Sequence, residues 1–110
     1  AFPSMERMLR RRFGMTHVAT NFEVVKDGDE MELDVLAYAN EDVNTAIIVE
    51  VKSHLRERDV EQVLKMMEKF PRFFPEHRGK KLHGILAGVQ VPTDVQRYAL
   101  VACAQLGPAY

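Results

Sequence analysis

The chain has 110 residues, of which 46% are hydrophobic and 28% are charged, and its formal net charge is −1. This length suits one domain with its own core, and the composition is typical of a folded, water-soluble domain rather than a disordered or membrane-embedded one. The near-neutral net charge excludes a general attraction to nucleic acid, so a nucleic-acid partner would have to be met by local clusters among the 15 lysines and arginines.

Cysteine content and hydropathy place further bounds. The single cysteine, Cys103, excludes an internal disulfide and a cysteine-based zinc cluster, and it fits a reducing compartment, so we expect a cytoplasmic protein. We expect no membrane partner, because the chain lacks both a run of about 18 apolar residues and a secretory signal. Since the chain begins with Ala1 and stops at Tyr110, we interpret residues 1–110 as a single domain cut from a longer protein.

The first half of the chain predicts a helix followed by three antiparallel strands. Ser4 is a suitable helix cap, apolar residues follow it at helical spacing, and Gly14 is a suitable stop. The Asp27-Gly28 turn joins two segments of strand-like composition, and a second polar turn leads into a third. We expect an antiparallel meander whose strands cover residues 17–26, 31–39 and 46–53.

In the second half the hydrophobic period changes. From Asp59 it is 3.6 residues, which predicts a helix that Pro71 ends. Residues 82–91 read LHGILAGVQV, which is apolar on both faces and indicates a central strand covered by helices. A capping box of Thr93 and Gln96 predicts a last helix that would bury Val95, Tyr98, Ala99, Ala102, Cys103 and Leu106.

These elements predict an α/β fold with the order α-β-β-β-α-β-α. The third strand, the middle helix and the fourth strand would form a right-handed βαβ crossover with the two strands parallel. The result would be a three-layer α/β/α domain with a mixed sheet and helices on both faces.

Charged residues interrupt one face of two predicted strands. Residues 47–53 read IIVEVKS, and side chains alternate along a strand, so one face of this strand carries Ile48, Glu50 and Lys52. By the same alternation, Leu33, Val35 and Ala37 of the preceding strand point away from the face that carries Glu32, Asp34, Leu36 and Tyr38. If the two strands pair through the turn at residues 40–45, Asp34 lies near Glu50 or Lys52. We therefore expect two carboxylates and one ammonium to converge.

Such a cluster has a chemical use. Two carboxylates held close repel one another unless a cation lies between them, and Mg²⁺ prefers oxygen ligands. Asp34, Glu50 and the backbone carbonyl of Val51 would suffice together with bound waters. A magnesium ion beside Lys52 suits phosphodiester hydrolysis, because the metal activates a water while the ammonium offsets transition-state charge.

An acidic residue on the second strand, Glu-Val-Lys on the third, and then a helix and an apolar strand resemble the core of the PD-(D/E)XK nuclease superfamily. This group includes many restriction endonucleases, Holliday-junction resolvases and repair nucleases. The resemblance covers most of the chain, and it implies a restriction-endonuclease-like fold and a nuclease that cleaves DNA with Mg²⁺ or Mn²⁺. It also implies that Asp34 and Glu50 bind the metal and that Lys52 is the catalytic lysine.

Two further residues match this superfamily in part. Glu6, on the first helix, stands where several members supply an additional acidic metal ligand, and Gln62 matches the catalytic glutamine that some branches carry on the middle helix. The sequence departs from the pattern at Leu33, which replaces the proline of the motif, and at Met66, which replaces a tyrosine often found four residues after the glutamine.

Structural alternatives exist for each of these residues. Glu6 is equally explained as a surface carboxylate near a helix N-terminus, and Gln62 as a capping-box partner three residues after Asp59. Glu50 and Lys52 could form an ordinary surface ion pair in an unrelated α/β domain. A second functional hypothesis is an inactive module of the nuclease fold that binds nucleic acid or assembles with a protein. Many relatives work as dimers, so we also expect a homodimer.

Overall fold

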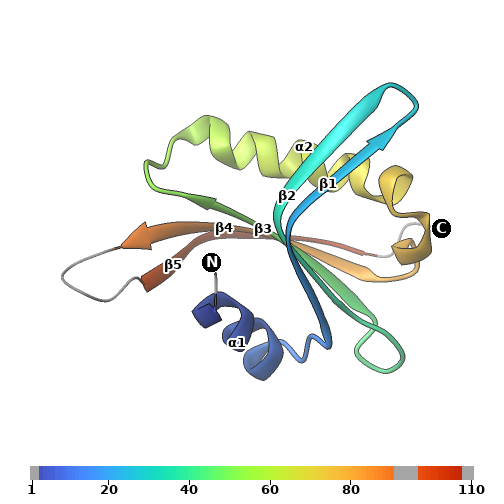
Figure 1. Ribbon diagram of the computed structural model, residues 1–110, viewed down its shortest axis with the longest axis horizontal. Coiled ribbons are helices and arrows are strands. Elements are labelled where there is room, and N and C mark those ends of the chain that lie inside the picture. Colours follow the sequence, from blue (N-terminus) through green and yellow to red (C-terminus); the bar gives the residue numbers. More distant parts are fainter. Residues whose placement is uncertain (1–2, 91–96, 108–110) are drawn as a thin grey trace.

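Residues 3–90 and 97–107, which the structure describes, form a five-stranded mixed sheet with a helix on each face (Figure 1). The structure is a computed structural model. In chain order the elements are α1 (Pro3–Arg12), β1 (His17–Lys26), β2 (Asp29–Ala39), β3 (Thr45–Lys52), α2 (Glu57–Phe73), the short 3-10 helix η1 (Pro75–His77), β4 (Lys81–Gln90) and β5 (Arg97–Leu106).

The strands lie in the order β1-β2-β3-β4-β5. β1, β2 and β3 form an antiparallel meander, β3 and β4 are parallel and are joined through α2, and β5 is antiparallel to β4. The predicted meander, the parallel β3–β4 pair and the mixed sheet are therefore confirmed. Within the described ranges no helix is long and apolar enough to span a lipid bilayer.

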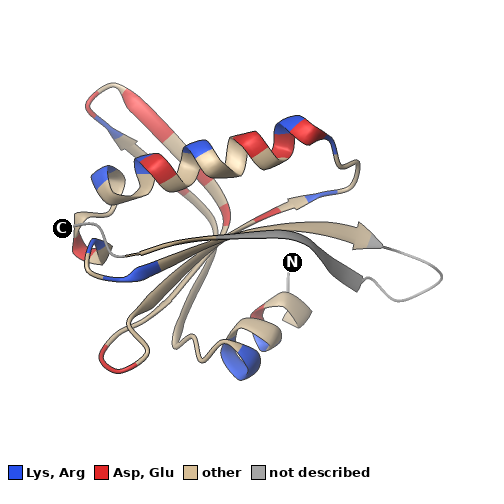
Figure 2. Cartoon of the chain, turned by 180° about the vertical axis from the view of Figure 1, so that it is seen from behind, with Lys and Arg blue, Asp and Glu red and all other residues tan. Residues whose placement is uncertain are grey.

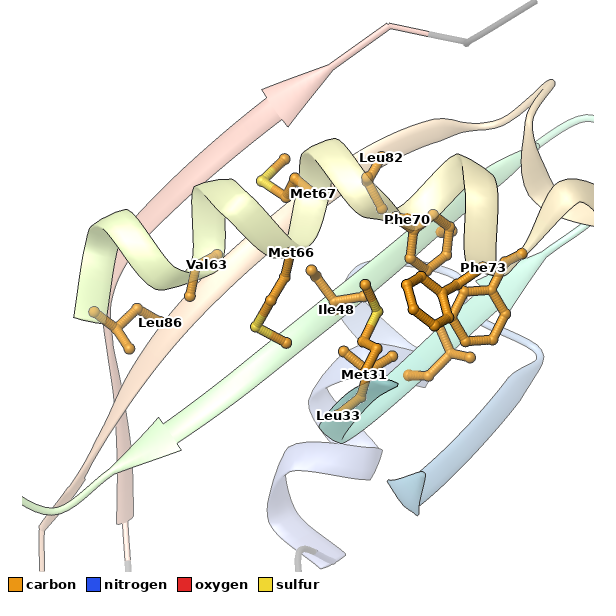
Figure 3. Packing of buried hydrophobic residues seen from close by; sticks show 13 residues of the cluster. Met31, Leu33, Ile48, Val63, Met66, Met67, Phe70, Phe73, Leu82 and Leu86 are labelled. Atoms are coloured by element: carbon orange, nitrogen blue, oxygen red, sulfur yellow. The ribbon is translucent and has the colours of Figure 1, made fainter. Parts of the chain in front are cut away.

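Two hydrophobic cores hold the layers together, one on each face of the sheet. The α2-side core (Figure 3) consists of Met31, Leu33, Leu36, Ala46, Ile48, Val63, Met66, Met67, Phe70, Phe73, Phe74, Leu82 and Leu86. The α1-side core consists of Met5, Leu9, Met15, Val35, Ala37, Ala39, Ile47, Val49, Ile85 and Ala87. β3 and β4 contribute to both cores, as their apolar alternation predicts.

α2 approaches β4 closely at Gly84. A Cβ atom at this position would collide with the side chain of Met67 and would lie 2.9 Å from Cγ1 of Val63. Glycine is therefore required here by the distance between helix and strand rather than by the backbone conformation.

The predicted last helix is wrong. Residues 97–106 form β5, so the order is α-β-β-β-α-β-β, and the predicted Thr93–Gln96 capping box lies outside the described residues. β5 pairs with β4 from Leu82↔Leu106 to Gln90↔Arg97. A short apolar run fits both a helix and a strand by periodicity alone, and here the unpaired edge of β4 decides in favour of a strand.

The predicted end of the middle helix is also wrong, because Pro71 lies inside α2, which continues to Phe73. Proline lacks an N–H group, but the next turn still closes, since the Phe74 N–H donates to the carbonyl oxygen of Phe70 at 2.8 Å. The aromatic side chains of Phe70 and Phe73 in this last part of the helix are buried in the α2-side core.

β2 changes the face that it presents at Asp34. Leu33, just before Asp34, is buried in the α2-side core, whereas Val35, just after it, is buried in the α1-side core. The expectation that these two side chains share a face is therefore wrong. Across the hairpin, Asn21 has a φ of 52°, and the pairing of β1 with β2 skips the Asn21 position. A local twist thus turns the β1–β2 hairpin toward α2, which it crosses obliquely in Figure 1, and leaves Asp34 at the bend.

Candidate functional site

Asp34 and Glu50 lie together where β2 separates from β3. The antiparallel pairing of the two strands ends at Val35 and Val49, and one further step in this register sets Asp34 opposite Glu50. Beyond the last pair, the Val51 N–H donates a hydrogen bond of 2.8 Å to Oδ2 of Asp34. The Asp34 carboxylate thus accepts a backbone hydrogen bond from β3 just beyond the point where the β2–β3 backbone pairing ends.

Glu50 is buried, with 7% of its surface exposed. Burial raises the pKa of its carboxyl from 4.5 to about 8, and a hydrogen bond with Asp34 and the negative charge of Asp34 act in the same direction. The nearby ammonium of Lys52 lowers this pKa, but by less. In this structure the protonated form of Glu50 is therefore favoured at neutral pH.

Lys52 is half-buried at the last position of β3, on the same side of the strand as Glu50. Ile47 and Val49 on the other side belong to the α1-side core, and Val51 packs against it. The predicted division of β3 into an apolar face and a face that ends in two charges is confirmed. Asp34, Glu50, Lys52 and the Val51 backbone are thus brought together.

Glu6 is placed differently. α1 covers the opposite face of the sheet from α2, and the Glu6 carboxylate lies 3.5 Å from Nε of Arg10, one turn along the same helix. Both side chains are close to half exposed. Glu6 is thus a surface carboxylate in the first turn of α1, and its described ion pair is with Arg10.

Gln62 is an exposed residue of α2 that lines a groove between this helix and the β1–β2 hairpin. Its predicted alternative role as a capping-box partner is wrong. α2 begins at Glu57, so Asp59 occupies the third helical position, and its Oδ2 accepts the Arg56 N–H at 2.8 Å. Asp59 therefore caps the helix from inside, and Gln62 lies one turn further on.

A small cavity of about 220 Å³ beside Asp34 brings in two residues that the sequence reasoning did not consider for the site, Glu23 and Glu32. They face each other across the β1–β2 ladder. Figure 2 shows that acidic residues follow the hairpin, whereas basic residues gather at the end of α1. Pairing the strands outward from the Asp27-Gly28 turn would have found the Glu23–Glu32 pair.

The Asp34–Glu50 site can supply only a few protein ligands to a metal ion. Among residues 3–90 and 97–107, no group of three or more histidine, cysteine, aspartate or glutamate side chains is arranged to hold a metal ion. Asp34 and Glu50 supply two carboxylates, and Mg²⁺ commonly binds through one or two carboxylates while keeping several waters. The donor set therefore fits Mg²⁺ or Mn²⁺ with a largely hydrated shell.

Comparisons of this chain with protein-family models and with curated proteins found no match. The resemblance to PD-(D/E)XK nucleases therefore depends on the residues and topology of this chain.

Proposed function

We propose that this protein is a metal-dependent nuclease of the restriction-endonuclease-like fold that hydrolyses phosphodiester bonds of DNA with Mg²⁺ or Mn²⁺. The observation that carries the proposal is the pairing of Asp34 with the buried Glu50 at the end of β3, with Lys52 two residues further on. The proposal includes a cytoplasmic location, which a single cysteine suits, and action as a homodimer.

A cation is the physical complement of this pair. A carboxylate buried beside another carboxylate pays for desolvation and for repulsion, and a divalent ion between them offsets both. β3 does not need Glu50 to hold it in the sheet, because Ile47 and Val49 on its other face are buried in the α1-side core. Asp34 and Glu50 would hold the ion, and the Val51 backbone would fix the Asp34 carboxylate through its N–H.

Lys52 would act on the scissile phosphate. When bound, the metal would polarise this phosphate and lower the pKa of a coordinated water. The Lys52 ammonium would orient that water and offset the charge that develops in the transition state. Arg56 and Arg58 are exposed just after β3, so they are suitably placed to contact neighbouring phosphates of the strand.

A cleavage assay tests this proposal. Plasmid, branched and single-stranded DNA are incubated with the protein in Mg²⁺ or Mn²⁺, with EDTA as the metal-free control. We expect cleavage that EDTA abolishes and that Lys52→Ala or Glu50→Gln reduces about 100-fold or more. Lys81→Ala and Glu41→Gln are matched controls, because both residues are exposed and lie near the opposite end of β3, where Thr45 pairs with Lys81.

Cleavage that is unaffected by Lys52→Ala would show that this lysine is not catalytic. If calorimetry detects no Mg²⁺ or Mn²⁺ binding that depends on Glu50, the nuclease proposal is wrong. DNA binding without metal binding would then favour the inactive module of the same fold.

A further inference from the structure

A second and larger cavity, of about 470 Å³, lies between the start of β1, the end of β2 and η1. Its lining includes Arg10, His17, Phe22, Tyr38, Phe74 and His77. Tyr38 lies four residues beyond Asp34 on β2, and the lining contains none of Asp34, Glu50 and Lys52. Cavities of this size commonly hold small molecules, since such sites measure about 300–1,000 Å³.

Aromatic rings form much of the wall. The ring of His17 stacks on that of Tyr38, with centroids 4.4 Å apart and planes inclined by 6°. The ring of His77 also contacts Tyr38, with centroids 4.4 Å apart and planes inclined by 44°. Phe22 and Phe74 make a second contact of 5.8 Å. His17 is exposed and lines the cavity at the end of this stack. Base stacking on aromatic side chains is a common mode of nucleic-acid recognition.

The cavity also has a cationic side. Nη1 of Arg10 donates to the carbonyl oxygen of Thr16 at 2.7 Å, and Nε lies 3.5 Å from the Glu6 carboxylate. These contacts hold the guanidinium beside the cavity and leave the Nη2 donors available. The lining contains one negatively charged residue, Glu76, and one arginine, Arg10. Arginine in such a fixed position is suited to a phosphate, which it can contact with two parallel hydrogen bonds.

Lys80 adds a positive charge behind the aromatic wall. Its Nζ lies 5.6 Å from the centroid of the Tyr38 ring, and only 8% of the residue is exposed. Among the ion pairs of the described residues none includes Lys80. Most of the residue is thus buried beside Tyr38, and its ammonium adds to the positive potential on this side of the wall.

His77 supplies an unmatched polar atom in the same wall. The residue is 7% exposed, and within the described part of the chain its Nδ1 has no hydrogen-bond partner. Buried polar atoms in folded proteins are nearly always hydrogen-bonded, to protein groups, water or ligand. Nδ1 itself is buried, so this unmatched atom lies inside the wall rather than on the open surface of the cavity.

We infer that this cavity is a nucleotide-binding site, in which a planar base stacks on the aromatic wall and a phosphate group binds Arg10. A free nucleotide and an unpaired nucleotide of a single strand present the same chemistry, so either source fits. The inference does not depend on nuclease activity, because it uses different residues and no metal.

Binding measurements with three probes test the inference. The full chain carrying Glu50→Gln is titrated in EDTA with dAMP, deoxyadenosine and deoxyribose 5-phosphate, and binding is followed by calorimetry and by the NMR signals of His17 and Tyr38. We expect dAMP to bind at least tenfold more tightly than either fragment, since each fragment lacks one of the two recognised groups. The use of EDTA and Glu50→Gln keeps the result separate from that of the nuclease proposal.

Variants then assign the contacts. Arg10→Ala should weaken dAMP at least tenfold while leaving deoxyadenosine unchanged, and His17→Ala should weaken both. Arg7→Ala is the matched control, because Arg7 is an exposed arginine of the same helix that does not line the cavity. His17 is exposed, so we expect His17→Ala to leave the fold intact. This variant therefore still tests the site if Arg10→Ala disturbs the fold.

A short single-stranded oligonucleotide, with and without an abasic position, distinguishes the two sources. Tighter binding of the intact oligonucleotide than of dAMP, weakened by His17→Ala, supports the site and identifies a strand as its occupant. Tighter binding of dAMP supports the site for a free nucleotide. The inference is overturned if neither probe binds at millimolar concentration, or if Arg10→Ala and His17→Ala both leave the affinities unchanged.

Discussion

Glu50 and Asp59 are the buried carboxylates among the described residues, and each is 7% exposed, yet their surroundings differ. Asp59 accepts the Arg56 N–H at 2.8 Å in the first turn of α2, where the helix dipole also favours a negative charge. Glu50 instead lies beside a second carboxylate, Asp34, and its pKa is raised to about 8.

This comparison separates a structural role from a functional one. The burial of Asp59 is explained by the helix that it caps, because its charge is matched by backbone groups of the chain. The burial of Glu50 has no such explanation among its described neighbours, since the approach of Asp34 opposes its ionisation. A buried carboxyl group whose ionisation the fold opposes is the kind of group that enzymes place at reactive centres.

The first effect expected from this comparison is stabilisation by a divalent cation. At 100 times its dissociation constant, Mg²⁺ or Mn²⁺ should raise the free energy of unfolding by about 2.7 kcal/mol, because it binds the folded state alone. Denaturant unfolding with and without the cation, at matched ionic strength, measures this gain. Asp34→Asn and Glu50→Gln should remove it.

Asp59→Asn is the matched control, since it neutralises the other buried carboxylate while keeping an oxygen that can accept the Arg56 N–H. It should retain the cation-dependent gain. An equal gain in the wild type and in Glu50→Gln would show that the ion binds elsewhere.

The second expected effect is on the pH dependence of stability in EDTA. The pKa of Glu50 is raised in the fold from 4.5 to about 8, so between these values the folded state retains a proton that the unfolded state has lost. The contribution of Glu50 is therefore fully present below about pH 4.5 and is lost as the pH rises toward 8. The free energy of unfolding should fall by up to about 1.4 kcal/mol for each pH unit in this window.

Glu50→Gln isolates this contribution, because glutamine keeps the size of the side chain and does not titrate. The difference between wild type and Glu50→Gln, measured by denaturant unfolding from pH 5 to pH 8, should follow the slope given above. A difference that stays constant across the window would mean that Glu50 ionises normally in the folded protein.

How far the sequence predicts the molecule depends on whether local patterns decide the outcome. Alternation along β3 correctly separates Ile47 and Val49 from Glu50, and the position of Asp34 opposite Glu50 follows from pairing across a short turn. These features were predictable because one strand and one turn determine them.

Features that depend on distant parts of the chain were not predictable in the same way. The face of Leu33 depends on the twist at Asn21, which a strict period of two cannot represent. The strand state of residues 97–106 depends on the free edge of β4 rather than on their own periodicity. The aromatic cavity combines His17, Tyr38 and His77 from three separate elements, so no local motif marks it.

The smallest expected effect concerns the carboxylate that the fold does compensate. Asp59→Ala should reduce the free energy of unfolding by about 1 kcal/mol, because the Arg56 N–H loses its acceptor and the helix loses a favourable charge in its first turn. Glu57→Ala, in the same turn but exposed, should change stability by less. Thermal or denaturant unfolding of both variants checks this. If Asp59→Ala also abolished the cation-dependent gain, the cap and the Asp34–Glu50 pair would be coupled, and the distinction between the two buried carboxylates would not hold.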